Sequence, residues 1–567
     1  MFSLRKIVIF LSIGMIVLSV RSLAQDKSRI DSLINFVINT HQNEISDSYF
    51  AFQLKDSSEN KVHKCGFGAS VVLHSEFNQL DENQQKLVGK VQSRPTLDTS
   101  IVSPQNLFRI HFRKSGTSAP QYDVNEFAKA CDSSYNYEVN FLGYPPPPND
   151  GGAGGDDKYD VYILDLSGLY GYTQPEIEVV GGSKTFISYI VVDNDFAGYY
   201  TRGIDAARVT IAHEFHHAIQ MGNYIVRVEN ETILDEFFYE ITSTAMEEFV
   251  YDSINDYYAY MRDNSGIYFN YTDKAFSKND GYNLAIWNIF LNENFGFEIL
   301  KRQWELMRDN NLRALQAIDK SLLDINSNYG FLEALSTFNI WTFFSGHRAE
   351  SNKYFKESNS YPQVKIKMGT VFSGGEKSIS SNINPAASSF ICFVNSSNLD
   401  SVVVALVNSD IEGAISAPSS TINLKYTLYN YNSNGSFKIT DNYFAKLETS
   451  QPSLWSTAEF INNELAKDGS FTSREIGLPY PSPFFYSKSN YLNFPLEKTI
   501  NSSAELFVYS ISMDLVYSSV LTVDFAKKRI RWNAKDNSGN KLPSGIYIYF
   551  INQKDNSQKG KFVILND

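Results

Sequence analysis

Cysteine is scarce in this chain of 567 residues, which contains only Cys65, Cys131 and Cys392. Three cysteines so far apart do not make the disulfide framework of a small secreted domain, and they leave room for one bridge at most. Positive charge is also limited, because 63 acidic residues outnumber 50 Lys and Arg and give a net charge of −13. Without a basic stripe, the sequence lacks the electrostatic footprint of a protein that binds nucleic acid.

Long apolar runs are absent after the first 24 residues, so we expect no later transmembrane span. The first residues are typical of a secretory signal peptide: Arg5 and Lys6 precede an apolar run over 7–20, and Ser22-Leu23-Ala24 offers a cleavage site before Gln25. The alternative is a membrane anchor, which the polar residues after the cut disfavour. We therefore expect export of the chain, to the cell surface or the medium.

Hydrophobic residues make up 43% of the chain and aromatic residues 14%, enough for several packed cores. Helical periodicity and β-branched runs predict a mixed region that starts near residue 108. Its expected strands cover 108–112, 159–164 and 185–192, and its expected helices cover 124–131, 206–221, 234–251, 282–307 and 331–344. Beyond about residue 365, short apolar strands alternate with Ser, Asn and Gly turns, which indicates a β-sandwich. A last β-rich unit begins near Pro479.

Three of the eight histidines fall within five residues, at His213, His216 and His217. On a helix, residues 213 and 217 lie one turn apart on the same face, so both imidazoles can bind one metal ion. Glu214, beside the first of them, can reach a water molecule on that metal. This H-E-x-x-H pattern predicts a zinc site. The alternative is a helix with a solvated His and Glu face, since a bare match also arises by chance.

A catalytic zinc needs a third protein ligand and one position left open for water. His216 points about 100° round the helix from His217 and cannot supply it. The next expected helix carries Glu240 and Glu247 on one face. We predict Glu240 as the ligand and Glu247 as a carboxylate that orients a ligand imidazole. The alternative for Glu247 is a plain surface acid.

The octapeptide His213-Glu214-Phe215-His216-His217-Ala218-Ile219-Gln220 resembles the H-E-F-x-H-x-x-Q motif of a group of secreted bacterial metallopeptidases of gluzincin type. The likeness covers roughly residues 100–360. It continues in Tyr159-Asp160-Val161-Tyr162, Val192-Asp193-Asn194-Asp195, Asn255-Asp256-Tyr257, Tyr282-Asn283-Leu284-Ala285-Ile286-Trp287 and Trp304. In gluzincins the third ligand is a Glu on the next helix, commonly in an E-x-x-A/T-x-x-x-E setting, which residues 240–247 match. The spacing from His217 to Glu240 is a few residues longer than in the best-known gluzincins.

The resemblance implies an α+β zincin-like fold and a secreted zinc metalloendopeptidase. In such an enzyme zinc makes its water more acidic and polarises the peptide carbonyl. Glu214 would act as general base and then pass the proton to the leaving amine. Tyr282 is a candidate for stabilising the oxyanion, because gluzincins often supply a Tyr or His from a downstream helix; the alternative is a packed aromatic residue. The expected strand 185–192 could bind a peptide substrate by edge addition.

Two weaker patterns lie outside this motif. Cys65 precedes the catalytic region, and a thiolate there could fill the open zinc position and keep a protease latent; the alternative is a structural cysteine. Acidic residues also cluster in a Gly-rich loop and after the strand 185–192, and they could bind structural Ca²⁺, although solvated turns are the alternative. These residues are Asp150, Asp156, Asp157, Asp160, Asp193 and Asp195.

The end of the chain carries a second resemblance. Tyr480-Pro481-Ser482-Pro483-Phe484 is similar to the Y-P-N-P-F opening of type IX secretion C-terminal sorting domains, with Ser in place of Asn. The likeness continues through Trp532-Asn533-Ala534-Lys535-Asp536, Ser544-Gly545-Ile546-Tyr547 and Lys559-Gly560-Lys561-Phe562-Val563, features also found in the FlgD-like immunoglobulin fold. It implies that the secretion machinery is a partner of this domain, across the outer membrane. The alternative is an ordinary β-module that binds carbohydrate or protein.

Together these patterns predict a multidomain chain, with an α+β zincin-like metallopeptidase domain followed by β-sandwich domains. The expected parts are a signal peptide over 1–24, an N-terminal region and candidate pro-segment over 25–95, the metallopeptidase domain over 96–365, a β-sandwich over 366–477 and the sorting domain over 478–567. Two alternatives share this layout. One is an inactive zincin-fold protein of the cell surface that binds or adheres, and the other is a hydrolase of something other than peptides.

Overall fold

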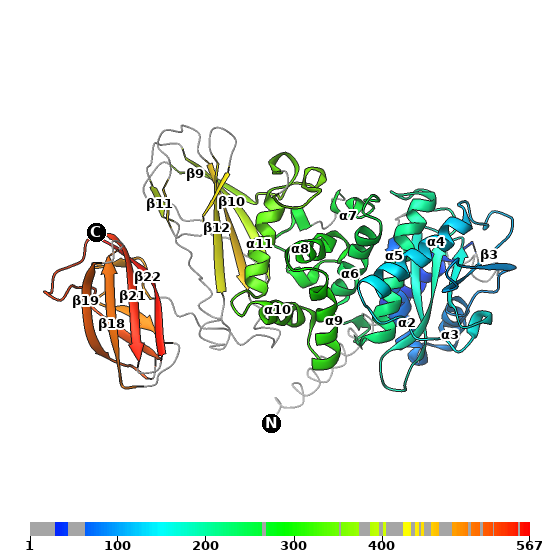
Figure 1. Ribbon diagram of the computed structural model, residues 1–567, viewed down its shortest axis with the longest axis horizontal. Coiled ribbons are helices and arrows are strands. Elements are labelled where there is room, and N and C mark those ends of the chain that lie inside the picture. Colours follow the sequence, from blue (N-terminus) through cyan, green and yellow to red (C-terminus); the bar gives the residue numbers. More distant parts are fainter. Residues whose placement is uncertain are drawn as a thin grey trace, which may run out of the picture. The chain divides into compact units, whose positions relative to one another are not determined.

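The structure is a computed structural model (Figure 1). It describes residues 29–43, 63–262, 268–350, 353–372, 386–395, 401–403, 423–431, 437–440, 444–446, 455–463, 479–496, 501–510, 514–525, 527–553 and 556–566. The expected signal peptide lies outside these residues. The chain divides into two compact units, residues 1–470 and 471–567, and each is considered by itself. The chain is therefore multidomain, with an α/β region and separate β-sheet parts, as the sequence predicts.

A six-stranded sheet lies at the centre of the α/β region, with the strand order β1-β5-β6-β4-β3-β2. Its strands are β1 His63–Cys65, β2 Thr99–Val102, β3 Phe108–Phe112, β4 Tyr159–Leu164, β5 Leu169–Glu178 and β6 Phe186–Asp193. β3, β4 and β6 run parallel, whereas β5 is antiparallel to β6 and β2 is antiparallel to β3. The three strands expected from β-branched and aromatic runs are confirmed.

The expectation that strand 185–192 is an edge strand is wrong. β6 lies inside the sheet, hydrogen-bonded to β5 on one side and to β4 on the other. Its residues from Ser188 to Asp193 are all buried, as expected for a strand covered on both faces. The strand next to the edge is β5, and the short β1 pairs with it in parallel. An extended peptide therefore cannot add to β6.

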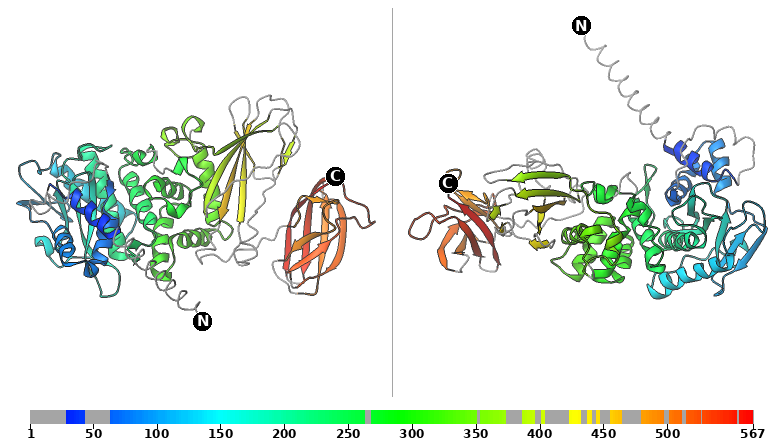
Figure 2. Two further views of the ribbon diagram at one scale, coloured as in Figure 1. Left: turned by 180° about the vertical axis from the view of Figure 1, so that it is seen from behind. Right: turned by 90° about the horizontal axis from the view of Figure 1, so that it is seen from above.

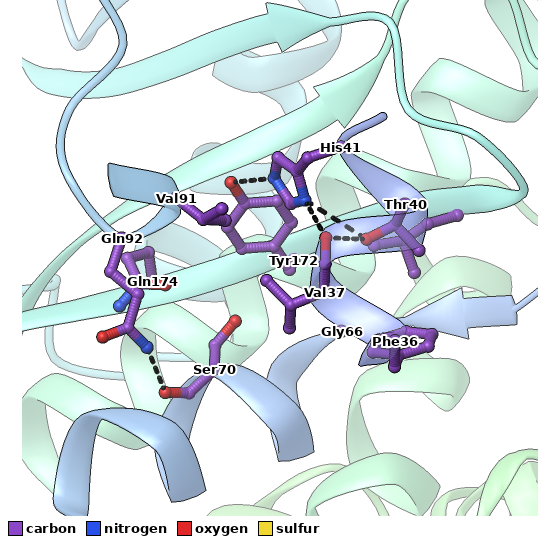
Figure 3. A pocket seen from close by; sticks show the side chains of 11 residues that line it. Phe36, Val37, Thr40, His41, Gly66, Ser70, Val91, Gln92, Tyr172 and Gln174 are labelled. Atoms are coloured by element: carbon purple, nitrogen blue, oxygen red, sulfur yellow. Dashed lines mark hydrogen bonds between the residues drawn. The ribbon is translucent and has the colours of Figure 1, made fainter. Parts of the chain in front are cut away.

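The N-terminal part of the described chain packs beside this sheet (Figure 2). Residues 29–40 are helical, and after β1 come α2 Phe67–Ser75 and α3 Glu82–Val91. His41 Nε2 lies 2.9 Å from the Tyr172 hydroxyl on β5, in a small pocket between the first helix and the sheet (Figure 3). α3 begins with a capping box in which Asp81 accepts hydrogen bonds from the backbone N–H groups of Asn83 and Gln84.

Two long helices follow the sheet and carry the motif residues. α5 Gly203–Asn223 packs against β5 and β6, and α6 Glu236–Val250 packs against α5 on the side away from the sheet (Figure 1). α4 Val124–Tyr135 lies beside α5 and continues into a π-helical turn, Asn136–Phe141. Phe215 anchors α5, because its ring contacts the rings of Phe108 and Tyr159 on the sheet.

The expected single helix over 282–307 is wrong, because the segment is broken in two. A 3₁₀ turn, Tyr282–Leu284, leads into α8 Ala285–Phe295, and α9 Glu298–Asn310 starts after Gly296. Gly296 has a φ of 80°, a conformation open to glycine and strained for other residues, so the helix ends there. α7 Tyr258–Arg262 precedes this segment, and α10 Ala314–Ile325 and α11 Phe331–Phe343 complete the helical part.

The sheet that follows the helices has the strand order β13-β12-β15-β10-β9, with a separate pair β11-β14. The strands are β9 Met368–Phe372, β10 Ala387–Asn395, β11 Ser401–Val403, β12 Asn423–Tyr431, β13 Phe437–Thr440, β14 Phe444–Lys446 and β15 Trp455–Asn463. β10 and α11 meet through the stacked rings of Phe390 and Phe343. This β-rich part agrees with the change of pattern near residue 365.

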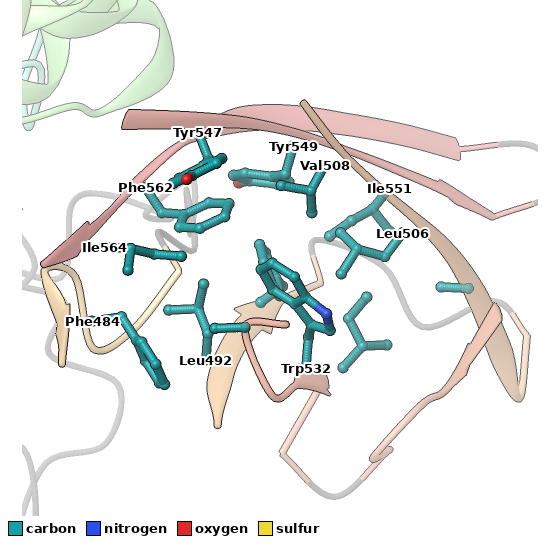
Figure 4. Packing of buried hydrophobic residues seen from close by; sticks show 14 of the residues in the cluster. Phe484, Leu492, Leu506, Val508, Trp532, Tyr547, Tyr549, Ile551, Phe562 and Ile564 are labelled. Carbon is teal, nitrogen blue, oxygen red and sulfur yellow. The ribbon is translucent and has the colours of Figure 1, made fainter. Parts of the chain in front are cut away.

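The C-terminal unit has a five-stranded sheet, β16-β22-β21-β18-β19, and a two-stranded one, β17-β20. Its strands are β16 Phe484–Phe485, β17 Leu492–Pro495, β18 Ser503–Ser510, β19 Leu515–Thr522, β20 Arg529–Trp532, β21 Gly545–Gln553 and β22 Asn556–Leu565. The two sheets enclose a core that includes Trp532, Phe494 and Phe562 (Figure 4). Within the described residues of the whole chain, no helix has the length and apolarity needed to cross a membrane.

Candidate metal centre

The donor atoms of the three predicted ligands lie close together between α5 and α6. These ligands are His213, His217 and Glu240. The Nε2 atoms of His213 and His217 lie 3.1 Å apart. Glu240 Oε2 lies 3.2 Å from His213 Nε2 and 3.5 Å from His217 Nε2. Around a tetrahedral zinc with ligands at 2.0–2.1 Å, such donors are separated by about 3.3–3.4 Å. The three side chains therefore fit a zinc ion in their present positions.

The other nitrogen of each imidazole faces an oxygen, which fixes the tautomer. His213 Nδ1 lies 2.8 Å from Glu247 Oε1, and His217 Nδ1 lies 2.7 Å from Gln220 Oε1. The Gln220 amide is itself oriented, because its Nε2 donates a hydrogen bond to Thr242 Oγ1 over 2.7 Å. With Nδ1 protonated on both rings, each Nε2 presents a lone pair to the point where the donors converge.

Glu214 lies between α5 and β5. Thr173 Oγ1 lies 2.8 Å from Glu214 Oε2, while Glu214 Oε1 is buried without a hydrogen-bond partner among the described residues. Gly171, two residues before Thr173 on the same strand, makes this approach possible. A Cβ at Gly171 would lie 2.7 Å from the Val191 carbonyl oxygen and 3.4 Å from Glu214 Cγ. Thr173 thus holds one of the two carboxylate oxygens of Glu214.

Cys65 is a fourth donor at the same place. Its Sγ, the two imidazoles and the Glu240 carboxylate offer donor atoms that all lie within 4.8 Å of one another. This set is the only group of His, Cys, Asp and Glu with metal-binding geometry in the described part of the chain. Burial raises the pKa of the Cys65 thiol, and the negative charges of Glu214 and Glu240 raise it further.

Lys64, the residue before Cys65, balances part of the buried negative charge. Its Nζ lies 2.9 Å from Glu247 Oε2 and 2.6 Å from Asp256 Oδ2, and all three side chains are at most 1% exposed. Asp256 also accepts a hydrogen bond from the Tyr170 hydroxyl. The two carboxylates raise the pKa of the Lys64 ammonium despite the opposing effect of burial, and Lys64 in turn lowers the pKa of Asp256.

Negative charge still exceeds positive charge around the donors. Glu214, Glu240, Glu247 and Asp256 are all at most 4% exposed, and within the described part of the chain Lys64 is the amine that lies among them. Without a metal, burial opposes the charge on His213, but hydrogen bonds to Glu240 and Glu247 raise its pKa to about 9. Burial likewise opposes ionisation of Glu240, and the imidazoles of His217 and His213 hold its pKa at about 2. Buried charge of one sign is costly unless it is compensated, so the residues favour a bound cation.

Tyr282 lies beside the donors, with its ring centroid 6.2 Å from that of His213. Burial raises the pKa of its hydroxyl, and the negative charge of Glu240 adds to the effect. Gly281 brings this residue close to α6: its φ is 101°, and a Cβ there would lie 2.5 Å from both Glu240 Cβ and the Phe237 carbonyl oxygen. The structure thus places Tyr282 near the centre, while its role stays a prediction.

His216 is apart from the donors, as its position on the helix predicts. Its Nδ1 lies 2.8 Å from Glu138 Oε2 on the π-helical turn. Burial lowers the pKa of His216 and raises that of Glu138, so the two form a neutral hydrogen-bonded pair. The third histidine of the cluster therefore packs α5 against the π-helical turn that follows α4.

The acidic loop residues face cations and backbone N–H groups. Asp150 and Asp160 both bind the guanidinium of Arg94, and Asp156 binds Lys158 and Arg109. At the end of β6, Asp193 accepts hydrogen bonds from the backbone N–H groups of Leu166 and Phe196, and Asp195 accepts one from Ala197. In the Gly-rich loop, the Asn149 side-chain amide donates a hydrogen bond to the Asp157 carbonyl. A calcium site at these residues stays a prediction, and the donor set of Cys65, His213, His217 and Glu240 lies elsewhere.

Sequence reasoning missed roles for Gln220, Thr173, Lys64 and Asp256. Gln220 belongs to the octapeptide motif and follows His217 by three residues, so its helical position could have indicated the contact. The other three come from β5, β1 and the loop after α6, and no local pattern joins them. Their meeting depends on how the sheet is assembled.

No protein-family model and no curated protein matches the chain. Among solved structures, part of it is similar to PorZ, an essential bacterial surface component of the type-IX secretion system of Porphyromonas gingivalis. The identity is 14%, the TM-score is 0.14, and the match covers 19% of this chain and 14% of that one. Dimeric latent PorU from the same organism matches with 11% identity and a TM-score of 0.14, over 25% of this chain and 16% of that one. The chain therefore matches less than a fifth of the length of either structure.

Proposed function

We propose that this chain is a zinc-dependent peptidase, exported from the cell, in which His213, His217 and Glu240 hold the metal. The observation that carries the proposal is the triangle of donor atoms, with sides of 3.1, 3.2 and 3.5 Å, formed by residues of two helices. Zinc bound there would polarise a carbonyl group and make a water molecule more acidic. We propose peptides as the substrate because the motif resembles that of gluzincin-type peptidases.

Glu214 is the general base in this proposal. Its Oε1 is buried and accepts no hydrogen bond from the described residues, so it can take a proton from the attacking water. Thr173 holds Oε2 and thereby keeps the carboxylate from rotating. The same oxygen then returns the proton to the leaving amine. Glu247 and Gln220 keep the two imidazoles in the tautomer that leaves Nε2 free for the metal.

The decisive test compares the purified protein with its Glu214→Gln variant, with zinc content measured on both. We expect hydrolysis of an unfolded protein substrate by the first, a loss of at least about a hundredfold in the second, and equal zinc in the two. Removal of zinc with a chelator should abolish the activity, and added zinc should restore it. Equal hydrolysis by both proteins would contradict the role of Glu214. Failure of the donor set to bind zinc would contradict the metal centre itself.

A second candidate function has one observation in its favour. Cys65 supplies a fourth donor, and zinc sites closed by four protein ligands are generally structural. In that case the chain would be a surface-binding protein with a stabilising metal. Zinc bound to a protein that stays inactive after Cys65 is replaced would favour this candidate.

We further propose that the C-terminal unit is a type IX secretion sorting domain. Residues of the motif form its structure: Phe484, Trp532 and Phe562 lie in the core (Figure 4). Ser482 Oγ accepts a hydrogen bond from the Val563 N–H. Deletion of residues 479–567 should retain the protein inside a bacterium that has this secretion system. Fusion of those residues to a signal peptide and a fluorescent protein should carry the fluorescence out. Export that does not depend on them would contradict the assignment.

A further inference from the structure

The strand His63–Cys65 lies where a peptide would be expected to bind. β1 adds to β5 in parallel, with His63 opposite Leu169 and Cys65 opposite Gly171. The ladder is continued on both sides by hydrogen bonds from the His63 N–H to the Gly168 carbonyl and from the Gly66 N–H to the Gly171 carbonyl, over 2.8 and 2.9 Å. β5 is also the strand that holds Glu214 through Thr173. The chain's own segment therefore covers the β5 edge beside the catalytic base.

The register places the thiol over the one residue of β5 that has no side chain to block it. Gly171 lies between the β1–β5 ladder and Glu214. A Cβ at this glycine would contact Thr210 and the Val191 carbonyl oxygen. Opposite this glycine, Cys65 Sγ comes within 4.8 Å of the donor atoms of His213, His217 and Glu240. The Phe67 N–H donates to the same sulfur over 3.2 Å.

We propose that Cys65 is the fourth metal ligand and that the strand His63–Cys65 is an internal inhibitor of the site. This inference rests on the proposed function. Thiolate is among the preferred ligands of zinc, and a Cys, two His and a Glu complete a four-coordinate site. The Cys65 sulfur occupies the coordination position that a catalytic water needs. The backbone of β1 occupies the edge of β5 to which a peptide substrate would add. The protein as described is thus a latent form.

The flanking residues show that the strand is held at this place from both sides of the cysteine. Lys64 is buried between Glu247 and Asp256, and Glu247 is the carboxylate that orients His213. On the other side, the Phe67 ring stacks on the His217 ring, with centroids 4.1 Å apart and planes 2° apart. Lys64 therefore contacts the carboxylate that orients His213, and Phe67 contacts His217. The two sides of Cys65 are thus held at two different histidines of the donor set. Withdrawal of the strand would open the coordination position and the β5 edge together.

Cobalt provides a direct test, because it can replace zinc and its absorption spectrum reports sulfur ligation. The full-length protein, Cys65→Ala and Cys131→Ser are each loaded with Co²⁺, and metal content is measured. Cys131 is the matched control, since it is a buried free cysteine on α4 outside the donor set. We expect a sulfur-to-cobalt charge-transfer band in the unmodified protein and in Cys131→Ser, and its loss in Cys65→Ala. Should Cys65→Ala fail to fold, Cys65→Ser serves in its place.

Two further measurements separate this inference from the proposed function. A thiol reagent should modify Cys65 in the metal-free protein and be blocked after Co²⁺ or Zn²⁺ is added. Hydrolysis of an unfolded protein should be faster for the zinc-loaded Cys65→Ala protein than for the zinc-loaded unmodified protein. The inference is overturned if the sulfur-to-cobalt band is absent from the unmodified protein or is retained in Cys65→Ala. In either case the proposed peptidase still stands if the unmodified protein hydrolyses its substrate. A band that depends on Cys65, together with no hydrolysis by any variant, supports the closed site and contradicts the peptidase.

Discussion

Lys64 and Glu247 form a buried ion pair, with Nζ 2.9 Å from Oε2 and both side chains at most 1% exposed. The pair joins the first strand of the sheet to the carboxylate that orients His213. A buried ion pair adds little net stability compared with an apolar pair of the same size, but the loss of one partner leaves the other charge uncompensated. The strand and the metal centre are therefore energetically coupled.

Lys64→Met should lower the free energy of unfolding by about 3–5 kcal/mol, because Glu247 and Asp256 would remain buried without a cation. Urea denaturation of the metal-free protein measures the effect. Adding Asp256→Asn to Lys64→Met should recover part of the loss. The control is Lys356→Met, which removes an exposed ion pair with Asp252 and should change stability by at most about 1 kcal/mol. Equal effects at the two lysines would contradict the coupling.

Gln220→Met should weaken zinc binding about 10- to 100-fold, because His217 Nδ1 would lose its shorter contact, with Gln220 Oε1, and keep only the 3.2 Å contact with Ser243 Oγ. Competition with a chromophoric chelator measures the affinity. Gln303→Met is the matched control, since Gln303 is also fully buried but its amide contacts Ser321, on α10. Both variants should lose some stability, and only Gln220→Met should lose affinity. An unchanged affinity would show that Gln220 does not orient the ligand.

Gly281→Ala should reduce both stability and zinc affinity. A residue other than glycine at a φ of 101° is strained by about 1–3 kcal/mol, and the new Cβ would press on Glu240 and the backbone of α6. Gly296→Ala is the comparison, because its φ of 80° is strained in the same way but nothing lies within 4 Å of the added Cβ. The temperature of thermal unfolding should fall in both variants. A loss of affinity confined to Gly281→Ala would show that the contact with Glu240 matters.

Glu248→Gln should change the pH dependence of stability. Burial raises the pKa of Glu248 to about 9, and the negative charges of Glu357 and Asp252 add to the effect. The folded protein therefore keeps a proton that the unfolded chain releases near its ordinary pKa of 4.5. Stability from this group is greatest below that value and is lost as pH rises to about 9. Glutamine does not titrate, so the free energy of unfolding of Glu248→Gln should decline less between these two pH values than that of the unmodified protein. An identical decline in the two proteins would show that folding does not raise the pKa of Glu248.

The sequence by itself determined the local features of this protein. The spacing of His213 and His217 places both rings on one helical face, and runs of β-branched and aromatic residues define β3, β4 and β6. Glu240 and Glu247 could be selected because residues seven apart share a helical face. These features depend on neighbours a few residues away, so a local pattern is enough to predict them.

Only the tertiary structure decided what surrounds these residues. Strand order placed β6 inside the sheet and β1 at its edge, and neither position follows from the composition of a strand. The same order brings Lys64 and Cys65 to residues more than a hundred positions later in the chain. The left-handed backbone at Gly296 divides a segment whose periodicity predicts one helix. Pairing between distant strands is set by packing of the whole sheet. For that reason the sequence could suggest Cys65 as a candidate ligand, but only the tertiary structure shows it beside the other three donors.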